Sequence, residues 1–275
     1  ITRNGVTQGI FPEGGLTRDG KLRPPKLGLL DYILGVARDP GFGERIYLVP
    51  VAINYDRVLE DRNLLRELAA GEGAPRRGRL RTMASIANYV FWGAGRVVTR
   101  TWKRYGRAAV TIGVPIPVRD WLSARDREGR TVLDLPRDER LARVQSLADG
   151  AMEQIGQLIP VTPVPLACAA LQSFPSEFVS RAALLGRMAE MRDALTEVNA
   201  RVVRADRDIG EVFDRAYLML RMRKVIVRTG EGYLVLPRGR ELISYYANSI
   251  AHLLGEYAEA VRARDMLRPD RLIDP

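Results

Sequence analysis

The sequence predicts an α/β part followed by a mostly helical part that contains one β-hairpin. Two nearly continuous apolar runs, at residues 46–55 and 107–118, are typical of strands, and a glycine-rich turn and a helical pattern precede the first run. From residue 139 onward the apolar residues recur at helical spacing, with one interruption at a Gly-Glu-Gly turn. The 275 residues are 46% hydrophobic, which suffices for one large core or two small ones.

The first expected element is a short strand at residues 7–11, which leads into a turn rich in glycine and charge. Gly14 and Gly15 allow positive φ angles and a close approach of the backbone to a ligand. Backbone N–H groups beside arginine and lysine side chains suit a phosphate. A solvated surface loop is the alternative interpretation. The cations of this turn are Arg18, Lys21, Arg23 and Lys26.

A helix is expected at residues 26–37, and the strand at residues 46–55 follows a turn at residues 39–43. The unbroken apolar character of this strand predicts burial on both faces of a parallel sheet. Strand, glycine-rich loop, helix and strand would form a βαβ unit, in which a ligand binds at the carboxyl ends of the strands. The turn that contains Glu13 lies at such an end.

The next segment carries the strongest charge asymmetry of a chain whose net charge is +10. A helix is expected at residues 61–70 and a linker at residues 71–78, and no acidic residue occurs between Glu72 and Asp120. We expect this basic patch to attract an anionic lipid surface, nucleic acid or an acidic protein. The aromatic and basic residues at 80–101 suit an interfacial membrane element, with a core-packed helix as the alternative. The cations of the patch are Arg76, Arg77, Arg79, Arg81, Arg96, Arg100, Lys103, Arg104, Arg107 and Arg119.

A polar stretch at residues 123–138 marks the expected boundary between two domains. The first domain comprises residues 1–122 and the second residues 137–275. An amphipathic helix at residues 139–158 is expected to open the second domain, because its apolar residues form one stripe.

The rest of the second domain is expected to resemble a winged-helix module. Ser176 is a candidate N-cap for a helix that runs to Val198, and another helix is expected at residues 208–222. A hairpin at residues 225–236 and a helix at residues 240–261 complete the module. Winged-helix modules often bind DNA, but the concentrated cations lie in the α/β part, so we expect no nucleic-acid partner.

One histidine and one cysteine limit the chemistry of the chain. They are too few for a zinc site or a Ser-His-Asp arrangement, so neither a metal nor a cofactor is expected. Cys168 has apolar neighbours, which predict a buried thiol in a reducing compartment. His252 has only Glu256 as a carboxylate neighbour on its helix, so we expect a structural role rather than general-base catalysis. No apolar run reaches the length that spans a bilayer.

The residues around Glu13 also resemble a known family. Residues 11–18, Phe-Pro-Glu-Gly-Gly-Leu-Thr-Arg, resemble the third sequence block of the glycerolipid acyltransferases. The resemblance is closest to the glycerol-3-phosphate acyltransferase branch, and residues 20–22 and 25–28 continue it with Gly-Lys-Leu and Pro-Lys-Leu-Gly. Residues 46–56, which contain Pro50, resemble the next block of this family.

The resemblance extends along most of the chain. Residues 113–116, Gly-Val-Pro-Ile, resemble the late strand of the family's α/β domain, and residues 161–165, Val-Thr-Pro-Val-Pro, resemble a segment that follows it in the bacterial enzymes. Residues 245–252, Tyr-Tyr-Ala-Asn-Ser-Ile-Ala-His, resemble a further family element.

The resemblance implies transfer of an acyl group from acyl-CoA or acyl-carrier protein to sn-glycerol 3-phosphate in phospholipid synthesis. It further implies a peripheral enzyme on the cytoplasmic face of the cell membrane, with an anionic membrane surface as partner and no cofactor beyond the acyl donor. Lys26 would add positive charge near the acceptor, and Pro50 would shape the acyl or acceptor pocket. The residues that the resemblance assigns to substrate binding are Glu13, Gly14, Gly15, Arg18, Lys26 and Pro50.

The chain departs from the family pattern in two respects. The His-x-x-x-x-Asp block, whose histidine is the family's general base, is absent, so we expect no catalytic residue in this chain. We interpret the chain as the C-terminal part of a longer enzyme and expect it to be inactive alone. Leu16 replaces a usual arginine, which leaves lysophospholipid or dihydroxyacetone phosphate open as acceptors. A non-catalytic membrane-surface binding protein with the same fold is the alternative outside enzymes.

Overall fold

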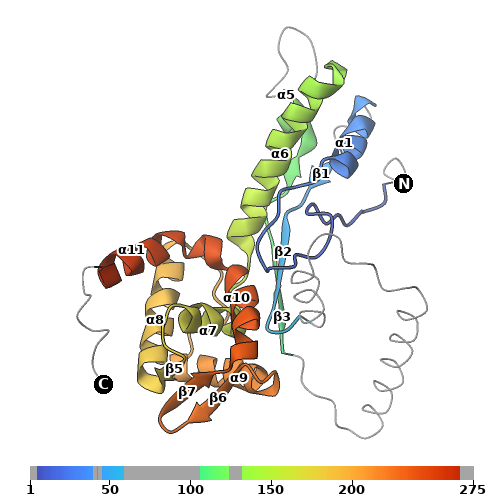
Figure 1. Ribbon diagram of the computed structural model, residues 1–275. Helices are drawn as coiled ribbons and strands as arrows, with labels where there is room; N and C mark the ends of the chain where they lie inside the picture. Colours follow the sequence, from blue (N-terminus) through green and yellow to red (C-terminus); the bar gives the residue numbers. More distant parts are fainter. Residues whose placement is uncertain (1–4, 40–41, 43–44, 59–105, 124–131, 267–275) are drawn as a thin grey trace, which may run out of the picture.

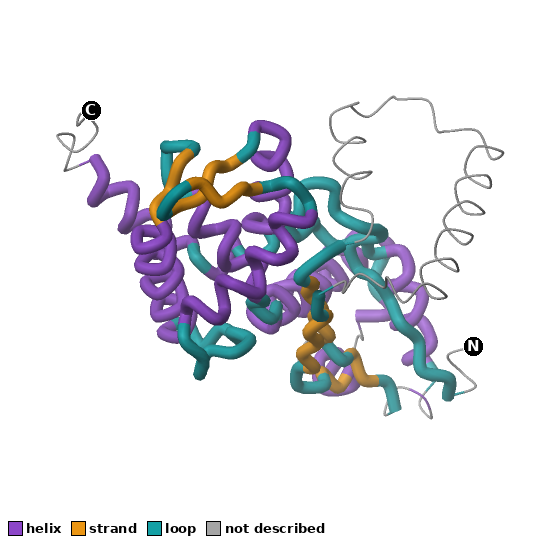
Figure 2. The backbone as a smooth tube through the Cα atoms, turned by 90° about the horizontal axis from the view of Figure 1, so that it is seen from below, coloured by secondary structure: helices purple, strands orange, loops and turns teal. Residues whose placement is uncertain are grey.

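The computed structural model describes residues 5–39, 42, 45–58, 106–123 and 132–266 (Figure 1). A helical bundle with its own small sheet lies at the C-terminal end of a long helix at residues 137–158, and the α/β part extends along this helix and reaches the bundle. The expected α/β class with a helical C-terminal region is confirmed. The strands form two separate groups, one in each part (Figure 2).

Several expectations lie outside the described residues. They are the helix at residues 61–70, the linker at 71–78, the membrane element at 80–101 and every cation of the basic patch except Arg107 and Arg119. The expected division of the chain into residues 1–122 and 137–275 stays a prediction.

The α/β part contains short elements. They are α1 (Gly28–Leu34), the 3-10 helix η2 (Gly35–Arg38), β1 (Tyr47–Leu48), β2 (Val51–Tyr55), β3 (Ala108–Ile112), β4 (Ile116–Pro117), α5 (Val118–Ser123) and the 3-10 helix η3 (Val132–Asp134). The helix expected at residues 26–37 and the strands expected at residues 46–55 and 107–118 are therefore confirmed, although each strand region is divided into two pieces.

The pairing of these strands differs from the expected parallel βαβ unit. β2 pairs antiparallel with β3, with Val51 opposite Ile112, and β1 pairs antiparallel with β4. Residues 7–11 form no strand. In β2 only Ala52 and Asn54 are buried, so burial on both faces was also wrong. A strand of an antiparallel pair whose outer face is apolar has apolar residues at successive positions, as does a strand buried on both faces. The sequence alone therefore does not distinguish the two.

The outer face of the β2–β3 pair is apolar. Its large side chains are 40–69% exposed among the described residues. We call this surface the outer sheet face, and its residues are Val51, Ile53, Tyr55, Val110 and Ile112.

The helix expected at residues 139–158 is confirmed as α6 (Arg137–Leu158), which joins the two parts. Its N-terminal half contributes Val144 to a small core that includes Leu34 of α1. At its C-terminal end, Ile155 and Leu158 pack against the larger core of the bundle. One helix therefore belongs to both cores.

The bundle contains four central helices, a three-stranded sheet and a C-terminal helix. Its elements are α7 (Pro163–Gln172), β5 (Phe178–Ser180), α8 (Arg181–Glu197), α9 (Ile209–Met222), β6 (Ile226–Thr229), β7 (Gly232–Val235), the 3-10 helix η4 (Pro237–Gly239), α10 (Arg240–Asn248), the 3-10 helix η5 (Ala251–Leu253) and α11 (Gly255–Met266). The antiparallel sheet has the order β5-β7-β6. Helix, strand, two helices and hairpin follow one another here, and the expected resemblance to a winged-helix module stays a prediction.

Two helix boundaries in the bundle correct the sequence interpretation. Ser176 does not cap a helix, because β5 intervenes and Ser180 caps α8 by accepting a hydrogen bond from the Ala183 N–H at 3.2 Å. The helix expected at residues 240–261 is interrupted, because α10 ends at Asn248. The helix expected at residues 208–222 is confirmed as α9.

Candidate functional site

The segment that contains the predicted site residues closes on itself. We call residues 11–26 the glycine loop. The Gly14 N–H donates to the Phe11 carbonyl at 2.9 Å, and the Lys26 N–H donates to the Pro12 carbonyl at 2.8 Å. These bonds hold the two ends of the loop together, so its backbone has a defined shape.

Glu13 braces the glycine loop from within. Its carboxylate accepts a hydrogen bond from the Arg23 N–H at 2.9 Å. Burial raises the pKa of Glu13, against the opposing effects of this bond and of the Arg23 charge. Because a carboxylate repels phosphate, a direct contact with an anion would be unfavourable. The geometry therefore gives Glu13 a bracing role in the loop.

Lys26 lies directly over Gly14. Gly14 has a φ of +72°, and a Cβ at this position would lie 2.5 Å from Lys26 Cδ and 2.9 Å from Nζ. The positive φ favours glycine at this position, and a Cβ would require the Lys26 side chain to move. The structure therefore brings two of the predicted residues together. Arg18, half-buried, belongs to the same loop.

The second half of the glycine loop is fastened to α10. Asn248 Nδ2 donates to the Asp19 carbonyl at 2.8 Å. Gly20, with a φ of +85°, lies so close to α10 that a Cβ would be 2.0 Å from the Tyr245 carbonyl oxygen. Asp19 in turn accepts a hydrogen bond from the Thr17 hydroxyl at 2.8 Å. Neither Gly20 nor Asn248 was predicted as a site residue, although both lie in segments that resemble the family.

Residues 245–252 also hold other parts of the molecule together. The Tyr246 hydroxyl accepts a hydrogen bond from the Val58 N–H at 3.1 Å. His252 Nε2 and the Gly156 carbonyl are 2.9 Å apart, and since a carbonyl only accepts, the ring nitrogen donates. His252 thus ties this segment to α6, which agrees with the structural role expected for it.

A buried carboxylate lies where β2 ends. Asp56 accepts hydrogen bonds from the backbone N–H groups of Arg107 at 3.1 Å and Val164 at 3.5 Å. Burial raises the pKa of Asp56, while hydrogen bonds to it act in the opposite direction. The sequence analysis did not single out this residue, although an aspartate directly after an apolar strand was a visible signal.

Pro50 is buried where β1 meets β2. Its carbonyl accepts a hydrogen bond from the Gly113 N–H at 2.8 Å. A Cβ at Gly113 would lie 3.4 Å from Pro50 Cβ and 2.5 Å from Leu158 Cδ1. These contacts are those of a packing residue, and the predicted part of Pro50 in a substrate pocket stays a prediction.

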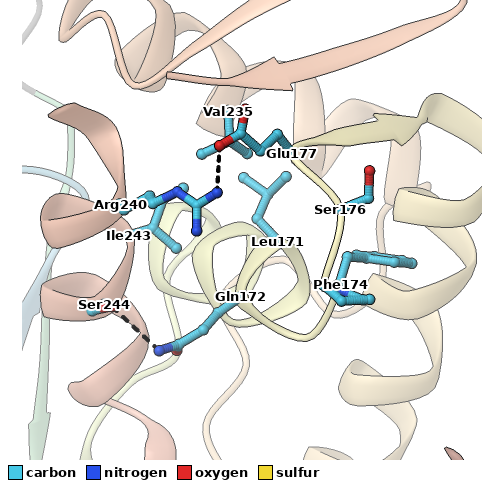
Figure 3. A pocket seen from close by; sticks show the side chains of 10 residues that line it. Leu171, Gln172, Phe174, Ser176, Glu177, Val235, Arg240, Ile243 and Ser244 are labelled. Atoms are coloured by element: carbon cyan, nitrogen blue, oxygen red, sulfur yellow. Dashed lines mark hydrogen bonds and ion pairs between the residues drawn. The ribbon is translucent and has the colours of Figure 1, made fainter. Parts of the chain in front are cut away.

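A separate hollow of about 140 Å³ lies in the bundle, between α7, α10 and the segment before β5 (Figure 3). Glu177 and Arg240 form an ion pair at its rim, and Gln172 Nε2 donates to the Ser244 hydroxyl at 3.3 Å. These two charged groups neutralise each other, so together they leave no net charge in the hollow.

The described part of the chain holds no group of three or more histidine, cysteine, aspartate or glutamate residues that could bind a metal. Cys168 is buried as expected, and burial raises the pKa of its thiol. No helix within the described ranges is sufficiently long and apolar to span a bilayer.

Comparison with known proteins defines the class of this chain. A family model described as the glycerol-3-phosphate acyltransferase C-terminal region matches residues 91–263. This match covers more than half of the chain. The chain therefore belongs to the family of glycerol-3-phosphate acyltransferase C-terminal regions.

Individual relatives agree with this assignment. The chain is 26% identical over 262 residues to the glycerol-3-phosphate acyltransferase of Alteromonas mediterranea, which covers 92% of this chain and 30% of the relative. It is 27% identical over 262 residues to the protein of the same name from Xanthomonas axonopodis pv. citri, covering 92% of this chain and 28% of the relative. The chain thus spans less than a third of the length of these curated relatives.

Proposed function

We propose that this chain is part of an enzyme that transfers an acyl group from acyl-CoA or acyl-carrier protein to sn-glycerol 3-phosphate. The family assignment and the names of the relatives support the acyltransferase class and the acceptor. In this proposal the glycine loop binds the acceptor phosphate, and the general base comes from a part of the enzyme outside this chain.

One observation carries this proposal. The two segments that resemble the family most clearly, the glycine loop and residues 245–252, meet through the hydrogen bond between Asn248 and the Asp19 carbonyl, although 229 positions separate the two residues. This bond anchors the glycine loop to α10. The anchor supports a loop whose backbone shape matters for binding.

The chemistry requires a positioned acceptor rather than a covalent intermediate. The acceptor hydroxyl loses its proton to the base as its oxygen attacks the thioester carbonyl, and the C–S bond then breaks as the base returns this proton to the leaving sulfur, which departs as the thiol. Arg18 and Lys26 would bind the acceptor phosphate and so hold the hydroxyl near the donor. Backbone N–H groups of the glycine loop would contribute further donors.

The chain alone is proposed to be inactive. Its single histidine, His252, is engaged with the Gly156 carbonyl and lies in the segment that ties α6 to the bundle. A purified 275-residue chain that turned over acyl-CoA at an enzymatic rate would contradict this part of the proposal.

A peripheral position at the cytoplasmic face of the membrane is also proposed. Phe11 and Leu16 are 79% and 60% exposed in the cationic glycine loop. Apolar side chains beside cations suit the boundary of an anionic bilayer. Sedimentation with phosphatidylglycerol vesicles tests this position. Substitution of both residues by serine is expected to reduce the fraction of protein that sediments with the vesicles.

The test of the proposed function uses the full-length protein and a panel of acceptors. Arg18→Ala and Lys26→Ala are each expected to raise the KM for glycerol 3-phosphate about 10- to 100-fold, because a hydrogen bond to a charged group contributes about 1.5–3 kcal/mol. Arg238→Ala, at an exposed position in the bundle, serves as the matched control.

The acceptor panel addresses the effect of Leu16. Glycerol 3-phosphate, dihydroxyacetone phosphate and lysophospholipid are compared with the same donor. Preference for either of the latter two would replace the acceptor in our proposal. Absence of acyl transfer with all three, together with binding to vesicles, would favour a non-catalytic membrane-surface protein.

A further inference from the structure

An open hollow lies between α9 and the hairpin that β6 and β7 form. It has a volume of about 480 Å³ and is separate from the glycine loop, which is fastened to α10. Helix α8 contributes its first residue to the rim. We call this feature the tyrosine hollow, and its lining residues are Arg181, Asp214, Tyr217, Leu218, Arg228 and Tyr233.

The floor of the tyrosine hollow is a packed aromatic group. Phe213 of α9 is fully buried, and its ring centroid lies 4.9 Å from that of Tyr233, which is also buried. Tyr217, one turn further along α9, is half-buried, and its ring centroid lies 5.2 Å from that of Tyr233. Rings that pack against one another in this way keep their orientation, so the hollow is formed in the absence of a partner.

The strand register places Arg228 on the same side as this floor. Arg228 lies directly opposite Tyr233 in the antiparallel β6–β7 pair, and residues that lie opposite each other point to the same face of the sheet. Because Tyr233 packs against α9, Arg228 also faces this helix. Its side chain is exposed and forms no hydrogen bond or ion pair with another residue in the described ranges.

A second cation without a carboxylate partner lies on α9. The Arg221 guanidinium lies 5.8 Å from the centroid of the Tyr217 ring, and it forms no ion pair with any other described residue. Leu218, one turn earlier on the same face of the helix, is 51% exposed. The tyrosine hollow therefore combines an exposed apolar side chain with the two cations Arg221 and Arg228.

The other charges of the tyrosine hollow compensate each other. Arg181 donates one hydrogen bond to the Asp214 carboxylate and one to the Tyr233 hydroxyl, each at 2.9 Å. Its guanidinium also lies 5.6 Å from the centroid of the Phe213 ring. Arg181 is thus bound to the walls of the hollow and neutralises Asp214.

These features suit a protein partner of negative charge. Tyrosine and arginine are enriched at protein interfaces, and cations at the rim select a partner of opposite charge. The Asp214 side chain is 60% exposed and would lie beside the phosphates of a nucleic acid or a lipid headgroup, which it repels. An open hollow also encloses less of a small molecule than a ligand pocket does.

We propose that the tyrosine hollow docks an acidic protein. Carboxylates of the partner pair with Arg221 and Arg228, and an apolar side chain of the partner contacts Tyr217 and Leu218. The partner is acyl-carrier protein, a small acidic protein, and this choice rests on the proposed function, in which it is one of two donors. The tyrosine hollow thereby gives the protein-bound donor a contact that acyl-CoA does not make.

Steady-state kinetics of the full-length protein, with the same acyl chain on both donors, tests this docking surface. The double substitution Arg221→Gln and Arg228→Gln is expected to raise the KM for the acylated carrier protein about tenfold, because rim charges govern association with a partner of opposite charge. The KM for acyl-CoA is expected to stay unchanged. Arg238→Gln, at an exposed position outside the hollow, is the matched control. Equal changes for both donors, or no change for either, would overturn the proposal.

A direct binding measurement distinguishes failure of the docking proposal from failure of the proposed function. Binding of full-length protein to immobilised acyl-carrier protein is expected to weaken about fivefold or more in the double variant, and this difference is expected to shrink at high salt. Leu218→Ser, which leaves the charges intact, is expected to weaken binding at both salt concentrations. Binding that weakens in these variants, in an enzyme without acyl transfer, would support docking and contradict the proposed function.

Two results would contradict docking while the proposed function stands. The first is acyl transfer by an enzyme whose binding to acyl-carrier protein is unchanged in the double variant and in Leu218→Ser. The second is a loss of sedimentation with phosphatidylglycerol vesicles in the double variant, with unchanged carrier-protein binding. This second result would assign the surface to a lipid bilayer.

Discussion

The bundle and the α/β part differ in how far their apolar side chains are buried. In the bundle every residue of α7 from Pro163 to Leu171 is buried, and the surrounding helices and sheet cover it on all sides. In the α/β part the outer sheet face presents five large apolar side chains to solvent. The bundle is a complete hydrophobic core, whereas the α/β part presents a surface of the kind that proteins use for contacts.

Two side-chain truncations, one in each part, test this difference and have the largest expected effect. Phe213→Ala in the bundle removes a fully buried ring and is expected to lower the free energy of unfolding by about 3–5 kcal/mol. Ile112→Ala on the outer sheet face, where the side chain is 69% exposed, is expected to change it by less than about 0.5 kcal/mol. Urea unfolding of the 275-residue chain measures both values. Equal costs would show that the outer sheet face is not free in this chain.

Two glycine substitutions test the contact between the glycine loop and α10. Gly20→Ala is expected to destabilise by about 1–3 kcal/mol, because φ is +85° and the new methyl group would collide with the Tyr245 carbonyl. Gly150→Ala within α6 meets no neighbouring atom and is expected to stabilise by about 0.5–1 kcal/mol.

Thermal unfolding measures both glycine variants. In the full-length enzyme, Gly20→Ala is also expected to raise the KM for glycerol 3-phosphate. An unchanged KM despite a lower Tm would show that the contact of Gly20 with α10 stabilises the fold but does not contribute to substrate binding.

The smallest expected effect concerns the pH dependence of stability. The pKa of Asp56 is raised in the folded state, so the folded protein retains this proton to higher pH than the unfolded chain does. Its contribution to stability therefore falls as pH rises through the window above 3.8, the value of an unperturbed aspartate. Asp56→Asn lacks this titration.

Urea unfolding at several pH values between about 3.5 and 7 tests this expectation. The free energy of unfolding of wild type, minus that of Asp56→Asn, is expected to decrease across the window. A difference that stays constant or increases with pH would show that the carboxyl is not penalised by burial.

Sequence patterns predicted the local elements well and the pairing of distant ones poorly. α6 and α9 were placed correctly because helical periodicity is a local property, whereas the Asp208 cap of α9 was found only in the structure. The pairing of β2 with β3 joins segments more than 50 positions apart, and no periodicity encodes that choice. Ser176 was a reasonable cap by type, but a three-residue strand that pairs with β7 occupies the next positions.

The candidate site, too, was predictable only where it depends on a local motif. The glycine loop could be identified from its motif, and Lys26 does lie against Gly14. The bracing role of Glu13 and the anchor at Asn248 depend on backbone groups that the motif does not specify.

The membership of α6 in both cores has a mechanical consequence. Its 22 residues span about 33 Å, and both of its ends are fixed. Near its start, Arg140 forms two hydrogen bonds to the Asp31 carboxylate of α1, and near its end the Gly156 carbonyl accepts from His252. α6 therefore acts as a strut that sets the distance between α1 and the segment that follows α10.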